Sequence, residues 1–433
     1  MKILVVTNLY PPHHLGGYEL GCRDIVEKLR ARGHAVQVLT SSFRNGDIET
    51  PPGETGVERT LQFSPTPPPG KRAECRKLAG LLKHFSPDVV YFSNQAGLCQ
   101  WLPVVARRHH QPMAFFLSDT SFASWRVGAW LMGWAGKKPE TLTPALSPLE
   151  RGEGEEKNTA VGDGERCSAP SLPGSGIHRI IRVLFGKTFL VRGWPVVRNR
   201  TCHFCSDFIR QTAAKNEIAV GPSSLVTHWG IDPAQFTATP RARWPVRRLL
   251  YVGRLSPQKG VHTALAALRL LAGTEEYSDL TLTLAGGGPD LEYGGKMRAL
   301  AAQSGLAGRV RFLGELPRAE LPRIYAEHDV LVFPSEWDEP FAITPLEAMA
   351  CGLAVVGTLT GGSGELFRDR ETAMTFAAGD AADCARALRE LCADRELFET
   401  ICRNAQREVR EKHTLDAMVD KIEASLMELK GRP

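Results

Sequence analysis

The chain has 433 residues, 43% of them hydrophobic and 23% charged, and its formal net charge is +5. A chain of this length is too long for one hydrophobic core, so we expect two domains. The composition is that of an ordinary globular protein. The mild positive charge permits an acidic ligand or an anionic membrane face but requires neither, and we expect no nucleic-acid partner.

The ten cysteines are scattered, which favours reduced thiols in a cytosolic compartment. Cys202 and Cys205 form a lone C-x-x-C in an apolar run that reads as a strand. Buried thiols are the favoured interpretation, with a metal or redox site as the alternative. The apolar run at the N-terminus is too short for a secretory signal, and no run of 18 apolar residues occurs. We therefore expect a cytoplasmic chain that does not span a membrane.

The first half of the chain alternates between strand and helix patterns. Apolar runs predict strands, and an amphipathic stretch at 18–32, ended by Gly33, predicts a helix. The predicted strands cover residues 2–7, 35–40, 88–93 and 112–119. Alternation of this kind predicts a parallel sheet with helices on both faces.

Two segments interrupt this alternation. Residues 136–176 are rich in Gly, Pro, Ser and Glu without apolar periodicity, which predicts a disordered surface insertion. Residues 178–200 carry six Arg or Lys and no acid. This stretch has two interpretations, a helix packed on the sheet with a solvated basic face or a patch that contacts anionic lipid headgroups.

A second alternating series follows the Pro-punctuated stretch 233–245, which we interpret as the interdomain linker. Its predicted strands cover residues 248–253, 281–285, 310–313, 330–333 and 354–357. A last amphipathic helix is predicted near the C-terminus. The chain thus predicts two doubly wound α/β domains, and ligands in such sheets bind at the carboxyl ends of the strands.

The stretch "SEWDEPFAITPLEAMACG" at 335–352 places Glu339 in a loop and Glu347 at the start of a helix. Thr344, Pro345 and Glu347 match a capping box with proline at the first helical position, which is a purely structural explanation for Glu347. That explanation leaves Glu339 without a role. A helix N-terminus with free amides binds anions, and a carboxylate beside it accepts hydrogen bonds from ligand hydroxyls.

Two further loops suit a phosphorylated ligand. In "YVGRLSPQKG" a strand ends at Gly253, and Arg254 and Lys259 follow at the carboxyl edge, where two cations fit a diphosphate. A solvated basic turn is the alternative. Gly16 and Gly17 precede a helix without the G-x-G-x-x-G spacing, so a nicotinamide cofactor is poorly supported. Paired glycines allow a close backbone approach to a ligand or simply form a tight turn.

Taken in order, "YPPHHLGG", "THWGIDPAQF", "GRLSPQKG", "SEWDEPFAITPLEAMACG" and "TGGSGE" resemble the motifs of retaining GT-B glycosyltransferases of glycosyltransferase family 4. The resemblance covers nearly the whole chain apart from the insertion. It implies two Rossmann-like domains that face each other across a cleft: an acceptor-side domain at 1–240 and a donor-binding domain at 246–414. It also implies that the last helix, within 415–433, packs back on the first domain.

The resemblance implies a role for each matching residue. Glu339 would contact the donor sugar, Glu347 the ribose, and Arg254 and Lys259 the diphosphate, while Asp119 would be a polar group at the reaction centre. Further donor contacts would come from both domains, through Gly16, Gly17, Glu315, Leu316, Phe341, Ala342, Ile343 and Thr344.

Two positions depart from the family pattern. Ala342 stands where many members have glycine, which is tolerable if its backbone φ is not positive. Ser118, before Asp119, stands where many members have an acceptor-side histidine.

The reaction that the resemblance implies is transfer of a sugar from a nucleotide diphosphate sugar to a hydroxyl with retention of configuration. The acceptor would be a glycan, a lipid-linked molecule or a small molecule. A lipid-linked acceptor would bring the chain to the inner membrane face. No Asp-x-Asp triplet occurs in the sequence, so we expect no metal and no cofactor. A pair of hydrolytic carboxylates, a sugar-nucleotide epimerase and a degenerate sugar-nucleotide binding module are the alternatives.

Overall fold

The computed structural model describes residues 1–433 except 45–53, 65–71, 100, 120–196, 198, 238–243, 289, 304 and 432–433. The predicted insertion at 136–176 and almost all of the basic stretch 178–200 lie outside the described residues, as does part of the predicted linker. None of the described helices is long and apolar enough to cross a bilayer.

The first sheet has seven parallel strands in the order β3-β2-β1-β4-β5-β6-β7. The strands are β1 (Lys2–Val6), β2 (Ala35–Ser41), β3 (Val57–Leu61), β4 (Val89–Phe92), β5 (Met113–Leu117), β6 (Thr201–Phe204) and β7 (Leu225–Val226). Its helices are α1 (Gly17–Ala31), α2 (Arg72–Phe85), α3 (Leu102–Arg108), α7 (Asp207–Lys215) and α14 (Leu415–Lys430). Strands β1, β4 and β5 lie at the centre of the sheet and are wholly buried apart from Lys2.

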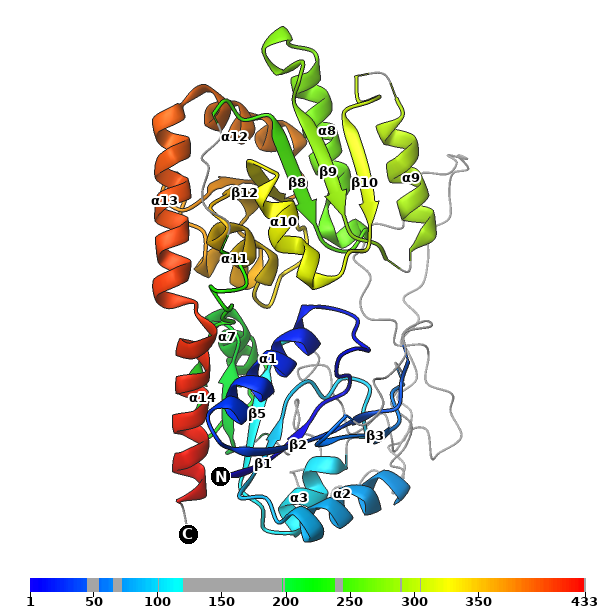
Figure 1. Cartoon of the computed structure of the whole chain (residues 1–433), viewed down its shortest axis with the longest axis vertical. Coiled ribbons are helices and arrows are strands. Elements are labelled where there is room, and N and C mark those ends of the chain that lie inside the picture. Colours follow the sequence, from blue (N-terminus) through cyan, green and yellow to red (C-terminus); the bar gives the residue numbers. More distant parts are fainter. Residues whose placement is uncertain are drawn as a thin grey trace, which may run out of the picture.

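The second sheet has six parallel strands in the order β10-β9-β8-β11-β12-β13 and lies beyond the carboxyl ends of the first (Figure 1). The strands are β8 (Arg248–Val252), β9 (Thr281–Ala285), β10 (Val310–Gly314), β11 (Val330–Phe333), β12 (Ala354–Thr358) and β13 (Met374–Phe376). Its α-helices are α8 (Val261–Ala272), α9 (Leu291–Ala301), α10 (Leu321–Ala326), α11 (Ile343–Ala350), α12 (Ala381–Ala393) and α13 (Arg395–Lys412). Short 3₁₀ turns are η2 (Pro257–Lys259), η3 (Glu275–Tyr277), η4 (Arg318–Glu320) and η5 (Gly361–Glu365).

The predicted α/β architecture is confirmed, and every strand predicted from an apolar run exists within two residues of its predicted bounds. The cysteines of the C-x-x-C are fully buried, and burial raises the pKa of both thiols well above its usual value. Strands β3, β7 and β13 were not predicted. They lie at the sheet edges and are short or half exposed, so they lack the continuous apolar run of a buried parallel strand.

Helix α14 continues from α13 in the second domain and lies along the first domain (Figure 1). His203 on β6 connects this helix to the sheet, because its Nδ1 lies 3.0 Å from the Tyr91 hydroxyl and its Nε2 lies 2.9 Å from Ser425 Oγ. The ring is fully buried. Burial lowers the pKa of His203 to about 3, so the imidazole is neutral in the folded chain.

The neutral His203 makes folding stability depend on pH. An unfolded histidine binds a proton below about pH 6.5 while the folded one does not, so stability falls as pH drops below that value. His203 contributes a slope of up to about 1.4 kcal/mol per pH unit. We expect His203→Gln to remove this share of the slope between pH 6 and pH 5, as measured by urea unfolding, while the exposed control His84→Gln retains it. An unchanged slope in His203→Gln would contradict the assignment.

Candidate functional site

A lysine and a glutamate pair at the carboxyl edge of the second sheet. Lys259 ends η2, and its ammonium forms an ion pair with Oε1 of Glu339, in the loop between β11 and α11. Ser335 Oγ donates a hydrogen bond of 2.6 Å to the same oxygen. Glu339 is only 5% exposed, so its charge depends on these two donors. One carboxylate oxygen is thereby occupied, and the structure records no hydrogen bond from a described residue to the other.

Glycines allow the two loops to meet. Gly260 follows Lys259 with φ of 64°, and a Cβ there would lie 1.9 Å from the Pro334 carbonyl oxygen. Gly286 has φ of 144°, and a Cβ there would lie 1.8 Å from the Gly253 carbonyl oxygen. Only glycine fits either position. Gly286 directly follows β9, so its role is to pack against the backbone of the loop after β8.

Arg254 precedes Lys259 on the loop after β8. Its backbone oxygen accepts a 2.6 Å hydrogen bond from the Tyr251 hydroxyl. Burial raises the pKa of Tyr251 well above its usual value, Glu339 raises it further, and Arg254 lowers it, so both charged groups lie near one phenol. The Arg254 side chain is exposed and has no acceptor among the described residues. Its guanidinium is therefore available to a ligand.

Glu347 is buried inside helix α11 and bound by two side chains. Arg318 Nε donates to its Oε1 at 3.2 Å and the Tyr325 hydroxyl donates to its Oε2 at 3.0 Å. Burial raises the pKa of Glu347, and Arg318 and Tyr325 act in the opposite direction. The other end of Arg318 bridges to Asp24 on α1, so this arginine connects Glu347 to the first domain.

The predicted capping box around Glu347 is wrong. Helix α11 starts at Ile343, with Ala342 at the N-cap and no side-chain capping bond. Thr344 therefore lies inside the first turn, where its hydroxyl cannot cap, and Glu347 is engaged by Arg318 and Tyr325. The first amides of α11 consequently have no side-chain cap, as an anion site at a helix start requires.

The start of α1 meets the start of α11 across the two domains. A Cβ on Gly17 would lie 3.0 Å from Ile343 Cδ1, so the glycine permits this approach. Gly16 is the N-cap of α1, and its amide donates to Glu19 Oε2 at 3.1 Å. Ala342 has φ of −87°. This value is not positive, so alanine is tolerated at this position. Phe341, just before it, is buried.

The remaining predicted residues lie around this contact. Burial raises the pKa of Tyr18 on α1 well above its usual value, and the nearby carboxylates of Glu339 and Asp119 raise it further. Asp119, after β5, therefore lies near the same phenol as Glu339, and Ser118 before it is buried. Glu315 and Leu316 follow β10; Glu315 is exposed and beside Gly287, and Leu316 is half-buried.

Glu365, in the "TGGSGE" motif, was not predicted to have a role. Its carboxylate accepts hydrogen bonds of 2.9 and 2.8 Å from the amides of Asp207 and Phe208 at the start of α7, and one of 2.8 Å from His228. Burial raises the pKa of Glu365, but these bonds lower it below its usual value. A carboxylate of the second domain thus caps a helix of the first. His228 also stacks on Phe341, with ring centroids 4.9 Å apart.

The arrangement combines three features at the carboxyl edge of the second sheet, which faces the first domain. They are two cations on one loop, a buried carboxylate with one oxygen unoccupied, and an uncapped helix start. Cations and free amides stabilise phosphate groups, and the carboxylate accepts hydrogen bonds from hydroxyls. Such edges are where open α/β sheets bind their ligands.

Two family models match the chain. Glycosyl transferases group 1 matches residues 244–408, and the glycosyl transferase 4-like domain matches residues 16–151. The glycogen synthase of Mycobacterium tuberculosis is 36% identical over 423 residues, covering 91% of this chain and 86% of the relative. An uncharacterized glycosyltransferase of Methanocaldococcus jannaschii is 31% identical over 451 residues, covering 100% of both chains.

Solved structures show the same fold. The Anabaena protein HepE in complex with UDP superposes with a TM-score of 0.68 at 20% identity, covering 99% of this chain and 100% of that one. WaaG, a glycosyltransferase involved in lipopolysaccharide biosynthesis, superposes with a TM-score of 0.61 at 16% identity, covering 99% and 100%. The sequence relatives, the two domain matches and the shared GT-B fold together show that this chain belongs to the family 4-like, group 1 glycosyltransferases.

Proposed function

We propose that this glycosyltransferase is a retaining, hexosyltransferase-like enzyme that moves a sugar from a nucleotide diphosphate sugar to an acceptor hydroxyl. The observation that carries the proposal is the contact of Lys259 with Glu339, on the loop edge that also carries Arg254, which has no acceptor among the described residues. HepE, which has the same fold, is solved with UDP and with UDP-glucose, and this supports a nucleotide sugar as donor. The acceptor is a glycan, a lipid-linked molecule or a small molecule.

The chemistry follows from where charge develops. As the glycosidic bond breaks, negative charge grows on the diphosphate and positive charge on the sugar ring. Arg254, Lys259 and the first amides of α11 stabilise the leaving diphosphate because they are already oriented before reaction. We propose that the two cations act without a metal, since the sequence has no Asp-x-Asp triplet. The departing phosphate oxygen accepts the acceptor proton, so no separate strong base is required.

The two glutamates have separate roles in this proposal. Glu339 accepts hydrogen bonds from the donor sugar through its unoccupied oxygen. Glu347 binds the ribose hydroxyls, because a carboxylate has about four lone-pair sites and Arg318 and Tyr325 occupy two of them. The alternatives are a degenerate binding module, which would bind donor without turnover, and an epimerase, which would turn over without an acceptor.

Donor turnover tests the proposal first. We expect purified protein to hydrolyse or transfer from UDP-glucose or GDP-mannose, with NMR showing a product of retained anomeric configuration. Glu339→Gln should lower turnover by about 100-fold or more, because a contact to the reacting sugar is lost. The neighbouring exposed Asp338→Asn is the control and should retain activity. An inverted product, or full activity in Glu339→Gln with an unchanged melting temperature, would refute the assignment.

The diphosphate site is tested by binding. Arg254→Ala should weaken UDP binding by about tenfold or more, because one charged hydrogen bond contributes about 1.5–3 kcal/mol. UMP binding should change much less, since UMP lacks the second phosphate. Isothermal titration measures both, with the exposed Arg269→Ala on α8 as control. Equal losses for UDP and UMP would place Arg254 away from the diphosphate.

The support of Glu347 is tested by a double substitution. Arg318→Gln leaves a buried carboxylate without its cation, so we expect the free energy of unfolding to fall by about 3 kcal/mol. Adding Glu347→Gln removes the stranded charge and should restore part of that loss. Urea unfolding at pH 7 measures both variants. If the double variant is less stable than Arg318→Gln alone, the ion pair does not hold Glu347.

A further inference from the structure

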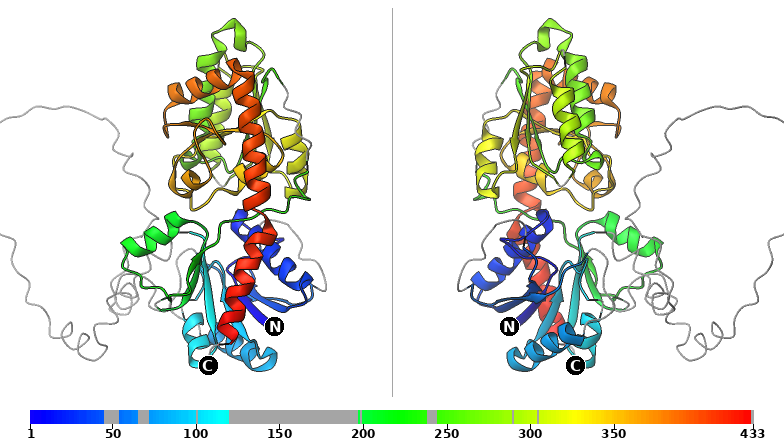
Figure 2. Two further views of the ribbon diagram at one scale, coloured as in Figure 1. Left: turned by 90° about the vertical axis from the view of Figure 1, so that its left-hand side faces the viewer. Right: turned by 90° about the vertical axis from the view of Figure 1, so that its right-hand side faces the viewer.

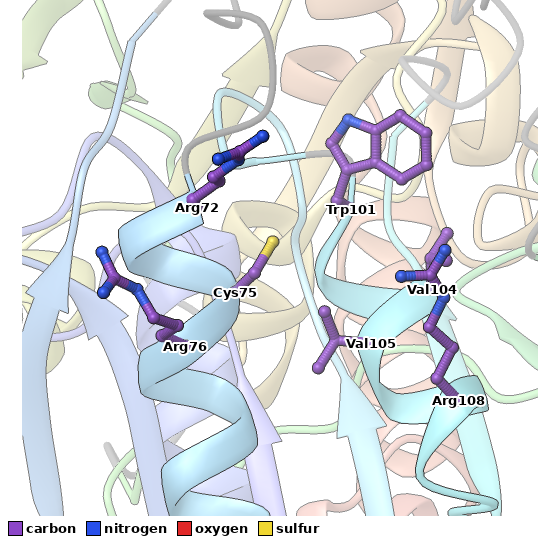
Figure 3. Close-up of a pocket in the computed structure, with 7 residues that line it drawn as sticks. All are labelled: Arg72, Cys75, Arg76, Trp101, Val104, Val105 and Arg108. Atoms are coloured by element: carbon purple, nitrogen blue, oxygen red, sulfur yellow. The ribbon is translucent and has the colours of Figure 1, made fainter.

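Helices α2 and α3 enclose a pocket apart from the site described above. The pocket has a volume of about 590 Å³ and opens among the side chains drawn in Figure 3. Arg72 and Arg76 reach it from α2, Arg108 from the end of α3, and Trp101 from the residue before α3. Cys75, Val104 and Val105 complete its lining. In Figure 3 the guanidinium groups of Arg72 and Arg108 lie nearer the space between the two helices, whereas that of Arg76 lies on the side of α2 away from α3.

These three arginines have no acceptor among the described residues. Within the described part of the chain, none of them takes part in a hydrogen bond or an ion pair. The acid in α2, Glu74, is buried and accepts a 2.7 Å hydrogen bond from the Gln62 amide, so it does not neutralise them. Like charges on neighbouring helices repel one another, and a bound anion relieves that repulsion. The planar guanidinium group presents several N–H donors in a geometry that matches the oxygens of a phosphate group.

The charge extends beyond the pocket along both helices. Residues 72–85 and 102–108 contain six Arg or Lys and one Glu, a formal excess of +5. The whole chain also has a net charge of +5, so the rest of the sequence is balanced. These two helices are thus one of two positive concentrations in the sequence, the other being the stretch 178–200, whose charge the remaining acids offset. A small soluble phosphate contacts only the pocket, whereas an anionic surface contacts Lys83 and Arg107 as well.

The pocket also has an apolar component. Trp101 is 37% exposed beside the arginines, and Val104 and Val105 are half-buried behind it. Tryptophan is the residue that suits the boundary between headgroups and acyl chains, since its ring is apolar and its N–H is polar. Helices α2 and α3 lie at the end of the first domain remote from the second domain (Figures 1 and 2). Contact there leaves the facing loops of the two domains accessible.

We propose that the α2–α3 pocket binds the phosphate headgroup of an anionic phospholipid and holds the protein on a membrane surface. Arg72 and Arg108 contact the phosphate, Arg76 adds to the positive charge of the surface that faces the membrane, and the Trp101 ring enters the interfacial region. This surface contains none of the residues of the basic stretch 178–200. The proposal does not depend on the sugar-transfer reaction, because binding to a membrane is measured without turnover.

Vesicle flotation of the full chain tests this proposal. We expect the protein to float with vesicles of phosphatidylcholine mixed with phosphatidylglycerol, and not with phosphatidylcholine alone. The triple variant Arg72→Gln, Arg76→Gln, Arg108→Gln should lose about 100-fold in binding, since each cation near an anionic surface adds roughly 1 kcal/mol. Trp101→Ser should also weaken flotation. UDP binding by the second domain and an unchanged melting temperature show that the variants are folded.

The matched control carries the same change of charge elsewhere. Arg395→Gln, Arg403→Gln and Arg407→Gln alter three exposed arginines of α13, and this variant should float like the parent chain. An equal loss in the control would overturn the proposal, because binding would then follow net charge alone. Flotation that is absent, or equal with phosphatidylcholine alone, would overturn it too. So would a pocket variant that floats normally but loses binding of inorganic pyrophosphate, which would assign the pocket to a soluble phosphate.

Discussion

The ion pair of Lys259 with Glu339 is the interaction on which the rest of the site depends. A carboxylate that is 5% exposed requires a cation and further donors, and here Lys259 and Ser335 provide them. The same lysine ends the loop that carries Arg254, so the pair fixes the loop and the carboxylate together. The close backbone approach at Gly260 makes this possible. A ligand with a diphosphate and hydroxyl groups would meet both partners at once.

The domains are joined by contacts that bear on the same residues. Arg318 binds Glu347 and Asp24, and Glu365 caps α7 while binding His228, which stacks on Phe341. Arg318 contacts Glu347 directly, and Phe341 follows Glu339 closely in the sequence. Movement between the domains would therefore alter the surroundings of both glutamates, as donor binding and release require.

The sequence predicted much of this because buried parallel strands are continuous apolar runs, and ligand loops follow their carboxyl ends. It placed Glu339, Lys259 and Arg254 on neighbouring loops. It could not reveal the roles of Arg318 and Glu365, because their partners lie far away in the chain and no local pattern marks such pairs. The capping box at Thr344 failed for a related reason. The local pattern was present, but the half-buried Arg318 and the buried Tyr325 bind Glu347 and the helix begins earlier.

A crystal structure of the chain with UDP bound tests the central claim most directly. The account predicts that the β-phosphate lies within hydrogen-bonding distance of Arg254 and Lys259, with the ribose hydroxyls on Glu347 and the space beside Glu339 open for a sugar. UDP bound with its phosphates away from both cations, or at another surface of the chain, would contradict it.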